Sequence, residues 1–158
     1  MEVKPLQIEH IARVEELLAL GAPYISVRTR SDYWLYATLF STSCPVVTEG
    51  DEVIGVLIAF QSQDDPDDVY IQDVMVHPDH RRRGVARRMI EVVHTQAATW
   101  NCRRMYLTSE PDNAAAHAAW LKHGFTNAAG DRIVDGVSVI SHFKGPGKHR
   151  AVYEFLIE

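Results

Sequence analysis

Residues 70–100 read YIQDVMVHPDHRRRGVARRMIEVVHTQAATW and contain two apolar patterns of different period. Up to Val76 the pattern is a short run rich in β-branched residues, which predicts a strand. Pro78 ends this strand, because proline has no N–H group to give to a strand ladder. From Val85 to Trp100 the apolar residues recur at helical spacing and predict one buried helix face. The stretch is therefore a strand, a turn and a helix in succession.

The turn, Arg81–Ala86, joins three arginines to a G-x-A sequence. A helix N-terminus has unpaired N–H groups and a partial positive charge, so small residues leading into it make a site for an anion. Gly84 and Ala86 keep side chains out of the way of that anion, and a diphosphate would fit. Taken separately, a G-x-A turn is a common helix start and an arginine run is usually a solvated surface. Together they favour an anion site.

Two motifs resemble those of the GNAT superfamily of N-acetyltransferases. The segment V-x-V-H-P-D-H-R-x-R-G-x-A-R-R-M-I is similar to the acetyl-CoA signature of that family, [RQ]-x-x-G-x-[GA] after an apolar strand and a His-Pro turn. Its fixed positions are held here by Arg81, Gly84 and Ala86, and the family's N-x-x-A…G-F pattern is held by Asn113, Ala116, Gly124 and Phe125. A weaker similarity points to diaminobutyrate and polyamine acetyltransferases.

The remaining patterns predict an α+β protein that forms one N-acetyltransferase-like domain over residues 1–158. Ser31 or Asp32 is expected to cap the second helix, and Pro5 is tolerated if the first strand lies at a sheet edge. The resemblance implies a GNAT-like fold: a mixed, mostly antiparallel sheet of about seven strands with about four helices on both faces. Strands are expected at 3–7, 45–48, 53–60, 69–76, 104–108, 132–141 and 150–157, and helices at about 9–20, 31–40, 85–100 and 114–123.

Bulk properties exclude several classes of function. The chain has 158 residues, 46% of them apolar, which is enough for one core, and a net charge of −5. A general nucleic-acid binder needs a positive electrostatic field, so this negatively charged chain is not expected to bind nucleic acid. Cys44 and Cys102 form no C-x-x-C pair, which fits a reduced compartment. The N-terminus lacks the apolar core of a signal peptide, and no apolar run approaches membrane-spanning length. The sequence predicts a cytoplasmic protein.

The resemblance implies that acetyl-CoA is the co-substrate and that no metal is needed. It implies that the strand ending at Val76 splays from its neighbour and pairs with the pantetheine arm through its backbone. His77 and His80 form an H-x-x-H, but no third ligand stands at zinc spacing. The residues expected to bind the co-substrate are Val74, Met75, Val76, Arg81, Arg82, Arg83, Gly84, Val85, Ala86, Asn113 and Ala116.

Proton handling departs from the family pattern. Many relatives carry a tyrosine seven residues after the asparagine, but this chain has Trp120, whose indole N–H is a donor that does not ionise. His117 and Tyr153 are candidates to replace that acid, against the alternative that both are packing residues. Asp73 is expected either to act as a base or to hold the ammonium of the acceptor, and we favour the second role. A surface carboxylate with neither role is the remaining alternative.

The acceptor is expected to be a small-molecule primary amine, bound by Arg28, Tyr33, Gln72 and Asp73. An arginine can bind a carboxylate bidentately and an aspartate can bind an ammonium, which suits an amino acid or a related diamine. Two alternatives stay open: a protein or peptide amine as acceptor, and a non-catalytic module that binds acyl-CoA as a regulatory ligand. A homodimer is common in similar proteins. The sequence does not name the acceptor amine.

Overall fold

The computed structural model describes residues 1–158 and contains one seven-stranded sheet, in the order β1-β2-β3-β4-β5-β9-β6. All neighbours in it are antiparallel except β4 and β5. This agrees with the mixed, mostly antiparallel sheet that the family resemblance implied. No helix has both the length and the apolar character needed to cross a membrane. The strands are β1 (Glu2–Pro5), β2 (Pro45–Glu49), β3 (Glu52–Gln61), β4 (Asp68–Val76), β5 (Arg104–Ser109), β6 (Thr126–Asn127), β7 (Arg132–Val134), β8 (Val137–Val139) and β9 (Ala151–Leu156), and the helices are α1 (Ile11–Ala19), α2 (Arg30–Leu39), α3 (Val85–Thr99) and α4 (Ala114–Lys122), with short 3-10 turns at Ile8–His10, Ser41–Ser43 and Pro78–His80.

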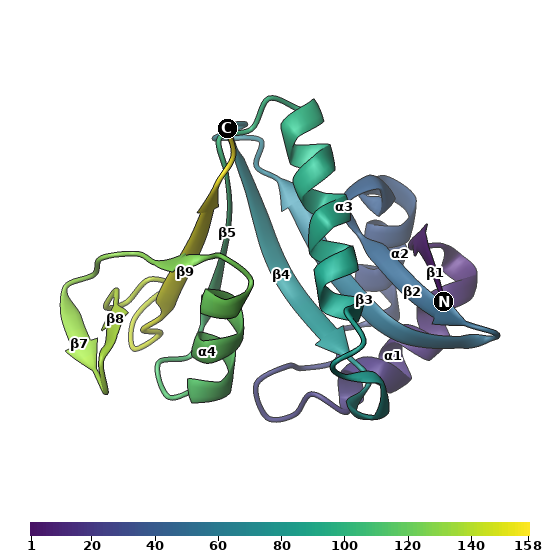
Figure 1. Cartoon of the computed structure of the whole chain (residues 1–158), viewed down its shortest axis with the longest axis horizontal. Helices are drawn as coiled ribbons and strands as arrows, with labels where there is room; N and C mark the ends of the chain where they lie inside the picture. Colours follow the sequence, from purple (N-terminus) through teal and green to yellow (C-terminus); the bar gives the residue numbers. More distant parts are fainter.

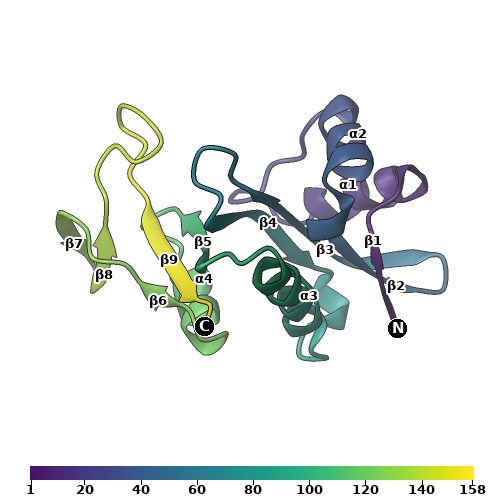
Figure 2. The ribbon, with the colours of Figure 1, turned by 90° about the horizontal axis from the view of Figure 1, so that it is seen from above.

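Helices cover both faces of the sheet. α1 and α2 lie on one face, and α3 and α4 lie on the other (Figures 1 and 2). The buried apolar side chains accordingly form two clusters, one between the sheet and α1–α2 and one between the sheet and α3. Gly55 permits a close approach on the second face, since a Cβ atom there would lie 2.6 Å from Val85 Cγ1 at the start of α3. This glycine lets α3 begin directly against β3.

β4 and β5 are paired over only part of their length. Their ladder extends from the Asp68–Arg104 pair to the Ile71–Leu107 pair, although β4 continues to Val76. Beyond the ladder the two strands diverge, as Figure 1 shows. The sheet therefore contains a split in its middle, at the end of β4 that leads into α3.

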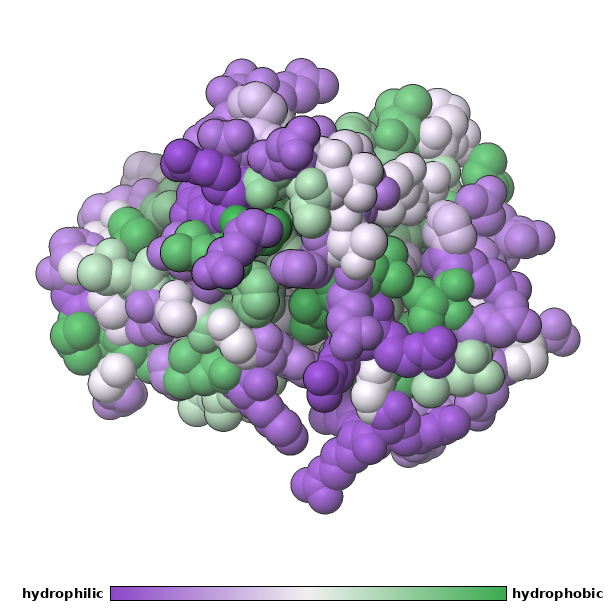
Figure 3. Space-filling view, turned by 45° about the horizontal axis from the view of Figure 1, so that its top comes forward, coloured by the Kyte–Doolittle hydropathy of each residue, from purple (hydrophilic) through white to green (hydrophobic).

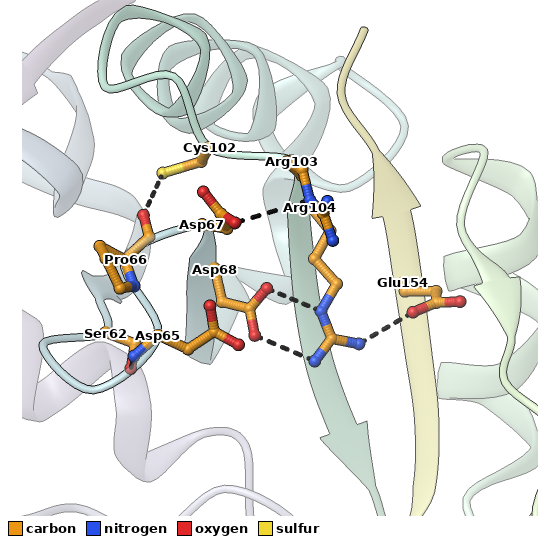
Figure 4. A network of polar contacts seen from close by, with 9 residues as sticks. All are labelled: Ser62, Asp65, Pro66, Asp67, Asp68, Cys102, Arg103, Arg104 and Glu154. Carbon is orange, nitrogen blue, oxygen red and sulfur yellow. Dashed lines mark hydrogen bonds and ion pairs between the residues drawn. The ribbon is translucent and has the colours of Figure 1, made fainter.

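The other end of the split is closed by a charged network around Arg104 (Figure 4). The guanidinium donates to both oxygens of Asp68, at 2.9 and 3.1 Å, and to Glu154 Oε2 at 2.9 Å. These contacts join β4, β5 and β9 through side chains. Arg104 also lies over the Tyr106 ring, 4.3 Å from its centroid. A bidentate ion pair restricts the relative orientation of the two side chains. The network therefore holds β4 and β5 together at this end, and the strands diverge only toward the other end.

Three sequence predictions about the elements were wrong in detail. α2 is capped by Thr29, whose hydroxyl oxygen accepts from the Asp32 N–H at 3.2 Å, instead of by Ser31 or Asp32. Residues 132–141 form no single strand, because Asp135 and Gly136 adopt positive φ and turn the chain into the β7–β8 hairpin, a separate two-stranded sheet. The first strand ends at Pro5 instead of Gln7, and it lies at the sheet edge as proline requires.

The face seen in Figure 3 is hydrophilic over most of its area, with apolar residues scattered among the polar ones. A stable obligate dimer normally buries a large and more apolar patch. The homodimer that is common in similar proteins finds no support on this face.

Candidate active site

A β-bulge at Gln72 organises the middle of β4. Ile58 of β3 is opposite Asp73 and Ala59 is opposite Ile71, so Gln72 has no partner on β3. One extra residue reverses the alternation of side chains beyond it. Gln72 and Asp73, although adjacent, therefore both turn toward α2 and the loop before it: Gln72 contacts Tyr36, and Asp73 contacts Arg28. The bulge concentrates two polar side chains beside the split.

Asp73 is a buried carboxylate with one cationic partner. Its side chain is only 7% exposed, and its Oδ2 accepts from Arg28 Nε at 3.3 Å. Burial raises the pKa of the Asp73 carboxyl above its ordinary value, and the charges of Arg28 and Lys144 act against that rise. The surface-carboxylate alternative is wrong, because the group is held inside the protein. Asp73 is influenced by two positive charges, Arg28 from the α1–α2 loop and Lys144 from the β8–β9 loop.

Aromatic residues of α2 form a wall beside Asp73. The Tyr33 hydroxyl accepts from the backbone N–H of Arg28 at 2.9 Å, which fixes the loop that carries the guanidinium. The Tyr36 hydroxyl accepts from Gln72 Nε2, also at 2.9 Å. Arg28, Tyr33, Gln72 and Asp73, the four predicted acceptor residues, are thus brought together. Tyr36, the last residue of the segment 24–36 on which the acceptor pocket was expected to draw, stands one helical turn after Tyr33 and so shares its side of α2.

The free edge of β4 offers backbone groups in the split. The His77 N–H donates to the Ile54 carbonyl of β3 at 2.8 Å, so by alternation the Met75 groups also face β3. Val74 and Val76 therefore present their N–H and carbonyl groups to the side from which β5 has diverged. The prediction for Met75 is not supported, because its side chain packs in the α1 cluster and its backbone faces β3.

The turn before α3 has the backbone of an anion site. Arg82 and Gly84 adopt positive φ, 65° and 76°, a conformation that aims successive N–H groups toward one side. The N–H groups of residues 81–87 donate to no other group of the protein. Arg83, by contrast, is already engaged: its guanidinium binds both carboxylate oxygens of Glu49, at 3.3 and 2.8 Å. The site therefore relies on backbone N–H groups, with Arg81 and Arg82 as the free cations of the turn.

The remaining predicted site residues come from α4, its N-cap and β9, and they lie on the α3 side of the sheet. Asn113 caps the helix, since its Oδ1 accepts from the Ala116 N–H at 3.1 Å. Trp120 is half-buried and packs edge-on against Phe125, with ring centroids 5.2 Å apart. Tyr153 is fully buried, and its hydroxyl lies 2.6 Å from His117 Nδ1.

These residues lie on the opposite face of the sheet from the Asp73 cluster, and the split runs between the two groups. Asn113, His117 and Trp120 are spaced by four and three residues, so they share one face of α4.

A cavity of about 530 Å³ lies elsewhere, between α1 and the turn that joins β2 to β3. Four of its nine lining residues are acidic, namely Glu16, Glu49, Asp51 and Glu52. None of the predicted site residues lines it, so the candidate site is defined by the split in the sheet and not by this cavity.

One strand–turn–helix unit thus contains the free edge of β4, the bulge beside it and a turn with unpaired N–H groups at the start of α3. The model of the acetyltransferase (GNAT) family matches residues 12–125, which include this whole unit. The chain belongs to the GNAT acetyltransferase family. The sequence prediction of the family is therefore confirmed.

Curated relatives of this GNAT protein include L-2,4-diaminobutyric acid acetyltransferases. That of Halomonas elongata is 32% identical over 100 residues, which are 63% of this chain and 52% of the relative. That of Vibrio parahaemolyticus is 25% identical over 140 residues, 89% of this chain and 76% of the relative. The matched chain thus spans about half the length of the Halomonas enzyme.

Solved structures share the fold across different acceptors. The diaminobutyrate acetyltransferase of Paenibacillus lautus, in complex with L-2,4-diaminobutyric acid and coenzyme A, superposes with a TM-score of 0.73 at 20% identity, covering 96% of this chain and 93% of that one. The ribosomal-protein-S18-alanine N-acetyltransferase of Escherichia coli gives the same TM-score at 13% identity, with 99% and 94% covered. The fold therefore does not show whether the acceptor is a small molecule or a protein.

Proposed function

We propose that this GNAT protein transfers an acetyl group from acetyl-CoA to a primary amine of a small molecule, by direct attack within a ternary complex. The observation that carries the proposal is the split beside Asp73: an open strand edge at Val74 and Val76, with unpaired N–H groups at the turn of Arg82 and Gly84. The similarity to diaminobutyric acid acetyltransferases favours an amino-acid or diamine acceptor over a protein.

The backbone supplies the binding groups for the donor. The N–H groups of residues 82–86 would hold the diphosphate of acetyl-CoA, because no protein acceptor competes for them. The free groups of Val74 and Val76 would hold the pantetheine arm as an added strand does, and a free N–H there can stabilise the oxyanion. When bound, acetyl-CoA supplies an acyl thioester whose carbonyl carbon accepts the amine.

Asp73 has the properties of a counter-charge for the acceptor. It is buried, ionisable and next to the open edge of β4, and Arg28 contacts it at a single position. An incoming ammonium could replace Arg28 at the carboxylate, which would orient the amine toward the split. The attacking amine must lose its proton to water before it attacks. Desolvation favours that loss, whereas the Asp73 carboxylate opposes it because it stabilises the charged form.

The first test measures release of free CoA. Purified protein is mixed with acetyl-CoA and a panel of amines, and the thiol is followed with a chromogenic disulfide. Thiol release that depends on an added amine supports the proposal. Tight acetyl-CoA binding without thiol release with any amine would instead support the regulatory-module alternative.

Trp120 is expected to line the site without giving up a proton. Its ring is held by Phe125, and an indole N–H does not ionise near neutral pH. Trp120→Phe should therefore change kcat by less than about threefold, and Trp120→Tyr should keep or increase it. Steady-state kinetics with both variants checks this. A hundredfold loss in kcat for the phenylalanine variant, about 2.7 kcal/mol, would assign the N–H a role in the reaction.

His117 is the proposed donor of a proton to the leaving thiolate, with Tyr153 as a residue that positions it. Burial raises the pKa of the Tyr153 hydroxyl, so that group keeps its proton and orients the imidazole through the 2.6 Å contact. Tyr153→Phe should lower kcat about fivefold, which corresponds to the roughly 1 kcal/mol of one hydrogen bond.

A change in the pH profile separates this positioning role from simple packing. Loss of the hydroxyl should change the alkaline limb of the kcat profile, because the proposed proton donor would no longer be held in place by the 2.6 Å contact. If Tyr153→Phe lowers only the Tm and leaves both kcat and its pH profile unchanged, Tyr153 is a packing residue.

A further inference from the structure

Lys144 extends from the β8–β9 loop across the sheet to β4. Its Nζ donates to the Tyr70 hydroxyl at 2.5 Å and lies 5.0 Å from the centroid of the Tyr70 ring. The loop that carries it is internally braced: the His142 N–H donates to His149 Nδ1 at 2.9 Å, and the two imidazole rings stack edge-on with centroids 4.6 Å apart. The position of the ammonium is therefore set by the loop.

The ammonium of Lys144 has a hydroxyl and an aromatic ring as neighbours and takes part in no ion pair. Lys144 lies against Tyr70, two residues before the bulge that presents Asp73. A cation held in this way is available to an anionic group of a ligand.

The guanidinium of Arg28 also has hydrogen-bond donors that no protein group uses. Only its Nε contacts Asp73, at 3.3 Å, and its two Nη groups donate to no protein group. The side chain is 37% exposed, so those Nη groups are open to a ligand. A guanidinium binds a carboxylate most strongly through two parallel donors, and these remain unused here.

The charges around the site favour one class of acceptor. Arg28 and Lys144 are positive and Asp73 is negative, so these three groups carry a net charge of one positive unit. Asp32, the next carboxylate along, keeps its charge but turns back to the start of α2, where it accepts from the Thr29 N–H at 3.2 Å. A molecule with two ammonium groups and no carboxylate would meet this excess positive charge. An amino acid would complement it, with its carboxylate between the two cations and an amine at Asp73.

We propose that Lys144 and the free Nη groups of Arg28 form a carboxylate subsite, so that the acceptor is an amine that also carries a free carboxylate. The inference rests on the proposed function, because it concerns the acceptor of that reaction. It goes further by assigning a recognition role to Lys144 and by excluding plain diamines as preferred acceptors.

Matched pairs of ligands test the subsite by binding. Calorimetry in the presence of saturating coenzyme A compares L-2,4-diaminobutyric acid with 1,3-diaminopropane, ornithine with putrescine, and free lysine with cadaverine. Each diamine is the amino acid without its carboxyl group. At least one amino acid should bind about tenfold more tightly than its diamine. Lys144→Met should reduce that preference about fivefold, and Lys144→Arg should retain it.

Lys148→Met is the matched control. Lys148 is an exposed lysine of the same loop whose side chain makes no hydrogen bond or ion pair. Its backbone N–H donates to the Gly145 carbonyl at 2.9 Å and its carbonyl accepts from the Lys144 N–H at 3.1 Å, and a methionine keeps both backbone contacts. Equal binding of amino acids and diamines, no binding by any of the amino acids, or equal effects of the two methionine variants would overturn the subsite. If the amino-acid preference is present but no CoA is released from acetyl-CoA, the subsite stands and the proposed acetyl transfer fails.

Discussion

Replacement of Asp73 by asparagine should raise the KM for the acceptor at least about tenfold, or about 1.4 kcal/mol, while the KM for acetyl-CoA barely changes. Asparagine keeps the size and hydrogen bonding of the side chain and removes only its charge. The substitution should therefore weaken binding of the acceptor, whose ammonium group the carboxylate is proposed to recognise. Steady-state kinetics with each substrate varied in turn measures both constants.

The same variant should keep its Tm or gain stability. Burial raises the pKa of Asp73, so the native state binds its proton more tightly than the unfolded chain does. Stability contributed by the protonated carboxyl is present below the unfolded pKa and is lost as pH rises through the folded pKa. Near neutral pH the ionised group is a cost to folding, and asparagine removes that cost. Arg28 loses its partner but is partly exposed and can be solvated.

Asp79→Asn is the control for Asp73→Asn. Asp79 is exposed, lies just after the same strand and is not part of the site, so its replacement should change neither KM nor Tm. A loss confined to kcat in Asp73→Asn, with a shifted acid limb of the pH profile, would make Asp73 a general base. If no kinetic constant moves, the proposed role of Asp73 is wrong.

The sequence predicted the family and the order of elements because both depend on local patterns. The strand before Pro78, the helix from Val85 and the glycine turn between them are each set by neighbouring residues. The predicted cap of the second helix failed because Thr29, Ser31 and Asp32 are all good capping residues, and local preference does not choose among them. The β7–β8 turn was missed because it depends on Asp135 at φ 50°, which sequence spacing does not reveal.

The candidate site was predicted in composition but not in geometry. Gln72 and Asp73 are adjacent and would face opposite sides of a regular strand, so only the bulge explains how both reach α2. The Arg28–Asp73 contact joins residues 45 positions apart, and the Arg83–Glu49 contact joins residues 34 positions apart. Single-sequence patterns carry no information on such pairs. The sequence consequently does not reveal that Glu49 binds Arg83, one of the three arginines predicted to bind the co-substrate.

Gly84→Glu should raise the KM for acetyl-CoA about a hundredfold and leave the fold intact. No atom lies within 4 Å of the position that a Cβ would take at Gly84, so the larger side chain meets open space. Its carboxylate would stand beside the N–H groups proposed to hold the diphosphate. Two charges about 4 Å apart repel by roughly 1–4 kcal/mol near a protein surface, and a hundredfold loss corresponds to about 2.7 kcal/mol.

Gly84→Ala separates charge from backbone strain. Gly84 has φ 76°, a left-handed conformation that costs any other residue roughly 1–2 kcal/mol, and alanine and glutamate share that cost. The alanine variant should therefore show a similar loss of Tm and a much smaller rise in KM. Calorimetric titration with coenzyme A, together with thermal unfolding, measures both quantities. Equal coenzyme A affinity in the two folded variants would mean that the diphosphate does not lie at this turn, and the free N–H groups of residues 81–87 would then need another ligand.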